Sequence, residues 1–325
     1  MDKHNQLHVI FGTGPLAKAV MRELVKNGKA IRMVNRSGKA EVPAGVEVSG
    51  ADAINPQDTR QVCRGAAVVY QCAQPGYAHW PEQFPALQAS ILEGAAANGA
   101  RLVVAENLYM YGEVDGPISE DLPYNAHTRK GRTRAQMSEV LLATHHAGKV
   151  RVAIGRASDF FGPEVLGSAA GDRVFYSMLA GKPAQVAGNI DALHTYTFIH
   201  DFGRALVVLG ERDEALGQAW HVPNAETLTT RQFLSTAFEL AGYPPKFSSM
   251  GRLMLRIGGL FIPEAGEMVE MMYEFEKPFV VDSSSYTRTF GEGATPIKDA
   301  LLQTLDWFRI RPEKGGKDLP SPVAG

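Results

Sequence analysis

The first half of the chain alternates short apolar runs with amphipathic segments, and this alternation constrains the fold more than any other feature. The runs predicted as strands are Leu7–Phe11, Ala30–Val34, Val46–Ser49, Ala66–Cys72, Arg101–Ala105 and Val150–Ile154. The segments predicted as helices are Leu16–Asn27, Pro56–Arg64, Glu82–Asn98 and Thr133–Ala147. Strands that alternate with helices are typical of a parallel sheet with helices on both faces. The pattern therefore predicts an α/β fold with a doubly wound parallel sheet.

The second half is less regular and predicts a smaller C-terminal lobe. We expect strands at Phe198–Ile199, Trp220–Val222 and Phe279–Val281, and helices at Phe202–Gly210, Gln232–Gly242 and Ile297–Phe308. His200 and Asp201 are expected to cap the first of these helices, and Thr229 or Thr230 the second. Residues 1–165 are assigned to the sheet domain, with residues around 190–225 returning to it, and residues 166–310 mainly to the lobe. Residues 311–325, rich in Pro and Gly, are expected to form a loose tail.

Composition excludes several classes of protein. The chain has 325 residues, of which 45% are hydrophobic, and its 33 Lys and Arg nearly balance its 35 Asp and Glu. It has neither the basic surplus typical of nucleic-acid binding nor an apolar run of the ~20 residues that a membrane span needs. No apolar segment suited to a secretory signal precedes Leu7, so a cytoplasmic location is expected.

Cysteine and histidine spacing indicates no metal or redox site. Cys63 and Cys72 match no disulfide or ligand pattern, and we interpret both as buried residues. The nine histidines show no metal-ligand spacing, and His145 and His146 are interpreted as a pair at a helix end. No metal is therefore expected.

A glycine turn, Gly12-Thr13-Gly14-Pro15-Leu16-Ala17, joins the first predicted strand to the first predicted helix. Such a turn needs one glycine for the sharp bend, one where pyrophosphate approaches the backbone, and a small residue where helix packs on strand. The N–H groups of the helix then face the phosphates. Gly12, Gly14, Pro15 and Leu16 thus predict a dinucleotide site on a Rossmann-type sheet, and a plain tight turn is the alternative.

The end of the second predicted strand indicates which dinucleotide binds. NAD-binding turns carry an acid here, which bonds to the ribose hydroxyl. This chain has Asn35, Arg36 and Ser37 instead. Arg36 can bind a 2′-phosphate bidentately, so NADP is favoured over NAD, and a solvated surface arginine is the alternative. Asp52, expected beside the adenine, and Ala73, after the fourth strand, are the remaining predicted cofactor contacts.

Several stretches beyond the glycine turn point to a known family. They are Tyr111-Gly112, Pro117–Pro123, Gly155–Pro163, Phe198–Asp201 and Phe279–Asp282. On these the chain resembles the extended short-chain dehydrogenase/reductases, the NAD(P)-dependent sugar epimerases and dehydratases, over nearly its whole length. The resemblance implies that the C-terminal lobe binds substrate and that Gly155–Pro163 forms a turn on the substrate side. It also implies a homodimer through the helices after the fourth and fifth strands.

The resemblance breaks at the catalytic positions. Family members use a Tyr as general base and a Lys four residues later, which binds the nicotinamide ribose and lowers the Tyr pKa. These positions fall on Lys130 and Arg134, and that of the Ser or Thr that holds the substrate oxygen falls on Asn107. Arg134 can donate hydrogen bonds to ribose but cannot give up a proton. Lys130 can act as an acid only where burial or its cationic neighbours lower its pKa, and Asn107 can orient a carbonyl.

A relocated phenol is a second source for the missing proton. Tyr109, Tyr111 and Tyr124 are the nearby candidates. Tyr111 and Lys130 are the favoured donors, and packing is the alternative role for each tyrosine. The downstream pair Tyr273 and Lys277 has the family's spacing but belongs to the lobe, and we interpret it as a coincidence.

The sequence leaves the substrate open. The Met-rich stretch Met250–Met272 either packs in a core or walls an apolar cleft. Four arginines are candidates to clamp a nucleotide-sugar diphosphate, namely Arg173, Arg231, Arg252 and Arg288. We expect an NADP-dependent oxidoreductase or epimerase/dehydratase-like enzyme that acts on a carbonyl or hydroxyl group of a small molecule or nucleotide sugar, with a nonstandard proton donor. The alternative is a sensor or regulatory protein that binds the cofactor without turnover.

Overall fold

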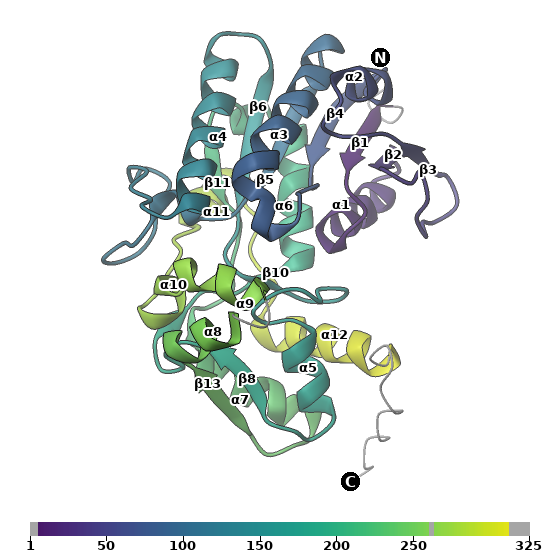
Figure 1. Cartoon of the computed structure of the whole chain (residues 1–325). Coiled ribbons are helices and arrows are strands. Elements are labelled where there is room, and N and C mark those ends of the chain that lie inside the picture. Colours follow the sequence, from purple (N-terminus) through teal and green to yellow (C-terminus); the bar gives the residue numbers. More distant parts are fainter. Residues whose placement is uncertain (1–5, 260–262, 312–325) are drawn as a thin grey trace.

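A parallel sheet forms the frame of the molecule (Figure 1). The computed structural model describes residues 6–259 and 263–311. Within them, seven strands pair in the order β11-β6-β5-β4-β1-β2-β3, and every pair is parallel. The strands are β1 (Leu7–Phe11), β2 (Ala30–Asn35), β3 (Val46–Gly50), β4 (Ala66–Gln71), β5 (Arg101–Glu106), β6 (Arg151–Arg156) and β11 (Ala219–His221). The predicted doubly wound α/β sheet is confirmed.

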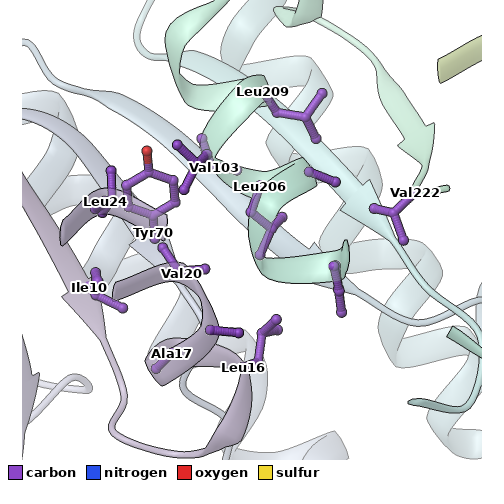
Figure 2. Close-up of a cluster of buried hydrophobic side chains, with 14 of the residues drawn as sticks. Ile10, Leu16, Ala17, Val20, Leu24, Tyr70, Val103, Leu206, Leu209 and Val222 are labelled. Carbon is purple, nitrogen blue, oxygen red and sulfur yellow. The ribbon is translucent and has the colours of Figure 1, made fainter. Parts of the chain in front are cut away.

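Helices cover both faces of this sheet. One face carries α1 (Pro15–Lys26) and α6 (Ile199–Glu211), and the other carries α2 (Pro56–Val62), α3 (Trp80–Ala97) and α4 (Arg129–His146). Successive strand residues point to opposite faces, so Ile10 packs with the first pair of helices and Val9 with the second group. Figure 2 shows the first core, where Val20 of α1 and Leu206 of α6 face Tyr70 and Val103 of the sheet.

Two helices, α4 and α6, start three or more residues earlier than the sequence predicts. The hydroxyl of Thr128 caps α4 by accepting from the Gly131 N–H at 3.0 Å, so α4 includes Lys130 in its first turn. The first turn of α4 consists mostly of basic residues, so apolar periodicity does not predict it. The helix α6 begins at Ile199, so the expected cap at His200 and Asp201 is wrong. Asp201 lies inside the first turn, where its carboxylate accepts from Thr295 at 2.7 Å.

A smaller lobe lies below the carboxyl edge of the sheet (Figure 1). Its core is formed by α5 (Asp172–Leu179), α7 (Thr230–Ala241) and α12 (Ile297–Ile310), beside the parallel strands β8 (Ala184–Ala187) and β13 (Phe247–Met250). Thr229 caps α7 in a capping box with Gln232, which confirms the predicted cap. Residues 312–325, the expected tail, lie outside the described residues.

Short pairings join the lobe to the sheet domain. They are β7 (Phe160–Phe161) with β10 (Thr197–Phe198), and β9 (Leu193–His194) with β12 (Leu228–Thr229). The predicted strand Phe279–Val281 is wrong, because Phe279 bridges to His194 while Val281 bridges to Ile118, each as an isolated contact. This segment therefore connects two parts of the chain instead of extending a sheet.

The chain between β13 and the C-terminal helix is a series of short helices. They are α8 (Arg252–Gly259), α9 (Pro263–Met268), the 3-10 turn Val269–Met271, α10 (Tyr273–Glu276) and α11 (Ser284–Phe290). α9 reaches across the carboxyl edge to the 3-10 turn Tyr77–His79, which follows β4. The lobe and the sheet domain thus meet at the loops that follow the strands. No helix in the described part of the chain is long and apolar enough to cross a membrane.

Candidate functional site

The glycine turn has the geometry that a bound pyrophosphate requires. Gly12 has φ +112°, and a Cβ built on it would lie 3.2 Å from the backbone nitrogen of Ala73. Its N–H donates to Val34 O at 2.8 Å, which ties the turn to β2. Gly14 precedes α1 with no side-chain cap and with open space where a Cβ would stand, so the first N–H groups of the helix face outward. The residues present therefore fit a dinucleotide phosphate at this helix N-terminus.

The turn after β2 is built around the side chain of Asn35. Its amide donates to Thr13 Oγ1 at 3.2 Å and to Lys39 O at 2.9 Å, and its oxygen accepts from the Gly38 N–H at 2.7 Å. Arg36 is exposed in this turn and has no hydrogen-bond or ion-pair partner among the described residues. An unpaired guanidinium thus stands beside the phosphate turn.

The remaining predicted cofactor contacts lie at the same edge of the sheet. Ser37 is exposed and its hydroxyl donates to Asn35 Oδ1 at 3.1 Å. The exposed Asp52 follows β3, and its carboxylate accepts one hydrogen bond, from the Ile54 N–H at 3.1 Å. One carboxylate oxygen of Asp52 is therefore left to bind a ligand amine.

Lys130 occupies a closed and acidic environment. Its side chain is 0% exposed, and Nζ contacts Glu267 and lies 2.7 Å from Glu270 Oε1. Nζ also lies 4.4 Å from the centre of the Tyr77 ring. The predicted cationic neighbours do not surround it, since Arg129 pairs with Glu267 on the outer side. Carboxylates that face an ammonium stabilise its charge.

Arg134 lies behind Lys130 and points toward the end of β5. Its side chain is 1% exposed, donates to Ala105 O at 3.4 Å and pairs with Glu106 at 3.4 Å. The guanidinium carbon lies 4.6 Å from the centre of the Phe84 ring, and Nε has no partner in the described part of the chain. Burial lowers the pKa of Arg134, whereas the charge of Glu106 opposes that change.

Tyr111 belongs to a buried network around Arg156. Its hydroxyl lies 2.9 Å from His221 Nε2 and accepts from Arg156 Nη1 at 2.5 Å. Arg156 also contacts the Tyr124 hydroxyl and pairs with Glu106 at 3.1 Å. Burial raises the pKa of Tyr111 to about 12. These contacts favour a structural role for Tyr111 and Tyr124 over the expected role of proton donor.

Asn107 and Tyr109 lie where the chain leaves β5. Asn107 Oδ1 accepts from the Tyr109 N–H at 3.4 Å, and its amide nitrogen has no partner among the described residues. The Tyr109 hydroxyl meets that of Tyr77 at 3.2 Å. Burial raises the pKa of both phenols above their ordinary value, and the charge of Asp159 adds to this rise.

Sequence reasoning missed Asp159, His194 and Tyr77. Asp159, in the Gly155–Pro163 stretch, has its Oδ2 atom 2.9 Å from His194 Nε2. His194 Nδ1 donates to the backbone oxygen of Glu274 at 3.2 Å. No sequence motif marks Tyr77, because it lies in an irregular loop outside the predicted helices and strands. Only Asp159 lay in a stretch that the resemblance had marked.

The candidate diphosphate arginines share no partner. Arg231 pairs with Asp191 at 2.6 Å and Arg252 with Glu276 at 2.8 Å, so carboxylates neutralise both. Arg288 donates to Ser284 and Ser285 on its own helix, α11. Arg173 is exposed on α5. The Met-rich stretch is mixed, with Met271 and Met272 buried and Met254 exposed.

The other motifs carry no further site. Cys63 is buried, Cys72 is half-buried, and both are free thiols. His145 and His146 lie in the last turn of α4, as predicted. Across residues 6–259 and 263–311, no group of three or more His, Cys, Asp or Glu side chains is placed to hold a metal ion.

Comparison with known proteins decides the family. A sequence profile described as the NAD dependent epimerase/dehydratase family matches residues 9–222. The chain belongs to this family. The match runs from β1 through the glycine turn to β11, so it covers every strand of the sheet. No curated protein sequence gives a significant match.

Solved structures of epimerases and dehydratases have the same fold. An epimerase from Methanothermobacter thermautotrophicus is 18% identical over 94% of this chain and 92% of its own, with a TM-score of 0.77. The dTDP-glucose 4,6-dehydratase of Bacillus anthracis is 12% identical over 94% and 97%, also with a TM-score of 0.77. The UDP-glucuronic acid 4-epimerase of Bacillus cereus is 16% identical over 93% and 98%, with a TM-score of 0.74. The expected extended dehydrogenase/reductase fold is confirmed.

Proposed function

We propose that this family member is an NADP-dependent oxidoreductase that acts on a carbonyl or hydroxyl group of a small molecule. The unpaired Arg36 beside the glycine turn is the observation that carries the choice of cofactor. The Bacillus cereus and Bacillus anthracis structures contain NAD. This chain has no acid at the end of β2 to accept from a ribose hydroxyl, and its exposed guanidinium suits a 2′-phosphate instead.

Each part of the cofactor has a proposed contact. The backbone of Gly12, Gly14 and Ala73 holds the pyrophosphate, Arg36 binds the 2′-phosphate, and Asp52 accepts from the adenine amine. When bound, the reduced cofactor supplies the hydride that converts a carbonyl to an alcohol. The free amide of Asn107 donates to the carbonyl oxygen and so orients it.

The charges around the cleft favour a substrate without a diphosphate. Solved relatives bind UDP-glucuronic acid and UDP-glucose. Here two of the four candidate diphosphate arginines are neutralised, Arg231 by Asp191 and Arg252 by Glu276. A neutralised arginine attracts a diphosphate only weakly, so we propose a smaller carbonyl compound as substrate.

The Arg36→Ala variant tests the cofactor assignment. Loss of a charge-assisted contact of about 1.5–3 kcal/mol weakens NADPH binding roughly tenfold to a hundredfold. NADH binding changes little, because NADH lacks the 2′-phosphate. Arg173→Ala, which removes another exposed arginine that is remote from the glycine turn, is the matched control. An unchanged NADPH affinity in Arg36→Ala would contradict the assignment of Arg36 to the 2′-phosphate.

A cofactor-binding sensor is the second candidate function. The observation that favours it is the burial of Lys130 and Arg134 in ion pairs, where neither presents a proton to a substrate. Oxidation of NADPH across a panel of carbonyl compounds and nucleotide sugars distinguishes the two. Turnover of any panel compound supports the enzyme, whereas cofactor binding without turnover supports the sensor.

We also propose a homodimer through α3 and α4. Val140 of α4 is exposed, as expected of a residue that a second copy would cover. Size-exclusion chromatography with light scattering measures the mass, and Val140→Glu is expected to convert a dimer to a monomer.

A further inference from the structure

Glu274 carries a buried carboxyl group with no hydrogen bond. The residue is 2% exposed on α10, at the junction of the lobe and the sheet domain. Neither side-chain oxygen has a hydrogen-bond partner among residues 6–259 and 263–311. Burying a polar group without a partner costs free energy, and buried polar groups in native structures are nearly always satisfied. The Glu274 carboxyl is therefore free to form a hydrogen bond with a bound ligand.

The neighbours of Glu274 oppose its ionisation. Burial and the charge of Asp159 raise the pKa of Glu274 well above its usual range. His194 lies between the two acids, but its Nδ1 reaches only the backbone oxygen of Glu274 and its Nε2 bonds to Asp159. Glu270 is compensated separately by Lys130 at 2.7 Å. Burial and the neighbouring acid thus both favour the protonated form of Glu274.

Glu274 lies close to the residues around the family's tyrosine position. It is near enough to Tyr77 and Tyr109, whose hydroxyls meet at 3.2 Å, for its ionised form to raise the pKa of both phenols. The Tyr77 ring in turn lies 4.4 Å from Lys130 Nζ, the group at the family's tyrosine position. The adjacent Tyr273 has a buried hydroxyl that also lacks a partner in the described structure. α10 therefore carries two buried polar groups without a hydrogen-bond partner among the described residues.

A carboxylic acid suits proton transfer here better than the phenols do. General acids work best when their pKa lies near the working pH. Burial moves the pKa of a carboxyl up toward neutrality, whereas it moves the pKa of Tyr77, Tyr109 and Tyr273 further above it. A buried carboxylic acid that stays neutral and donates to a substrate oxygen is an established catalytic device.

We propose that Glu274 is the proton donor of this cleft, in place of the tyrosine that Lys130 replaces. The proposal rests on the proposed function. As the carbonyl carbon accepts hydride, the C=O electron pair moves to oxygen, and that oxygen takes the proton from Glu274. The product is an alcohol, and the carboxylate that remains regains a proton from water. In the direction of oxidation the carboxylate accepts the alcohol proton.

Infrared spectroscopy of the full chain tests the protonation directly. The NADPH-loaded wild type at neutral pH is expected to show a protonated-carboxyl band that Glu274→Gln loses. Glu276→Gln is the matched control, because Glu276 lies on the same helix and pairs with Arg252 at the surface. Gln has the shape of the protonated acid, so the variant is expected to fold. A band of equal strength in wild type and Glu274→Gln overturns the proposal.

Turnover supplies the second measurement. With a carbonyl compound that the wild type reduces, Glu274→Gln is expected to lower kcat by about a hundredfold and to change KM by less than about threefold. Unchanged kcat overturns the proposal. If the wild type reduces no compound of the panel, binding of at least one compound is expected to shift the protonated-carboxyl band of Glu274. A band that no compound shifts also overturns the proposal. NADPH affinity is measured separately. A wild-type protein that does not bind NADPH shows that the proposed function has failed, whereas NADPH binding with an unchanged kcat in Glu274→Gln shows that only the role of Glu274 has failed.

Discussion

The ammonium group of Lys130 lies 2.7 Å from Glu270, in a contact that joins the first turn of α4 to the short helices of the lobe. Glu267 completes the group from α9. The residue expected at the family's tyrosine position is thus part of a buried ion-pair group that joins the two parts of the molecule. This arrangement predicts effects on stability as well as on chemistry.

Lys130→Met is expected to destabilise the protein by about 2–4 kcal/mol. The loss follows because Glu267 and Glu270 remain close together without their shared cation. Urea denaturation measures it. Lys277→Met is the control, since its exposed pair with Glu113 contributes at most about 1 kcal/mol. Equal losses in the two variants would show that the Lys130 group adds nothing beyond a surface pair.

Glu106→Gln is expected to destabilise the protein by about 3–5 kcal/mol. Glu106 pairs with Arg134 and Arg156, and all three side chains are buried. Without its charge, two guanidinium groups face each other in the interior. Denaturation compared with Glu47→Gln, which breaks an exposed pair with Arg32, measures the difference. A loss below about 1 kcal/mol would contradict the buried-charge account.

His221 is expected to make stability fall as the pH decreases from about 6.5 to 4. Burial lowers its pKa to about 4 and the charge of Arg156 adds to this, whereas the contact of Nδ1 with the Asp282 backbone oxygen at 2.9 Å opposes the change. The unfolded chain then binds more protons than the folded chain in this range, and the lost stability reaches about 3 kcal/mol. Denaturation against pH should show a smaller acid loss in His221→Gln. An NMR titration of His221 with a midpoint near 6.5 is the contrary outcome.

Glu274 is expected to have the opposite dependence on pH. Its pKa is raised, so the folded state binds the proton more tightly than the unfolded state does. The stabilisation is present below the unfolded pKa of ~4.3 and is lost as the pH rises toward the folded value. Glu274→Gln should therefore be more stable than wild type at alkaline pH and similar to it at pH 5. Parallel stability curves from pH 5 to 9 would argue against a neutral acid.

The sheet and the phosphate turn were predictable because local patterns determine them. β1, the turn at Gly12 and the start of α1 are contiguous in sequence, and their apolar periods and glycine spacing favour a strand, a turn and a helix in this order. The cap at Thr229 was predictable for the same reason. The exposed Arg36 could also be identified as a candidate from its place after a strand.

The acidic groups of the cleft were not predictable. Glu270 meets Lys130 across 140 residues of chain, and no local pattern links the two. Glu274 comes from a four-residue helix inside an irregular segment. The spacing of Tyr273 and Lys277 was correctly interpreted as a coincidence, because Lys277 lies beyond α10 and pairs with Glu113.

The affinity of the wild-type protein for NADPH and for NADH, measured side by side by calorimetry, tests the central claim most directly. The account predicts that NADPH binds at least about tenfold more tightly, since the 2′-phosphate gains the Arg36 contact. Equal affinities, or tighter binding of NADH, would contradict it.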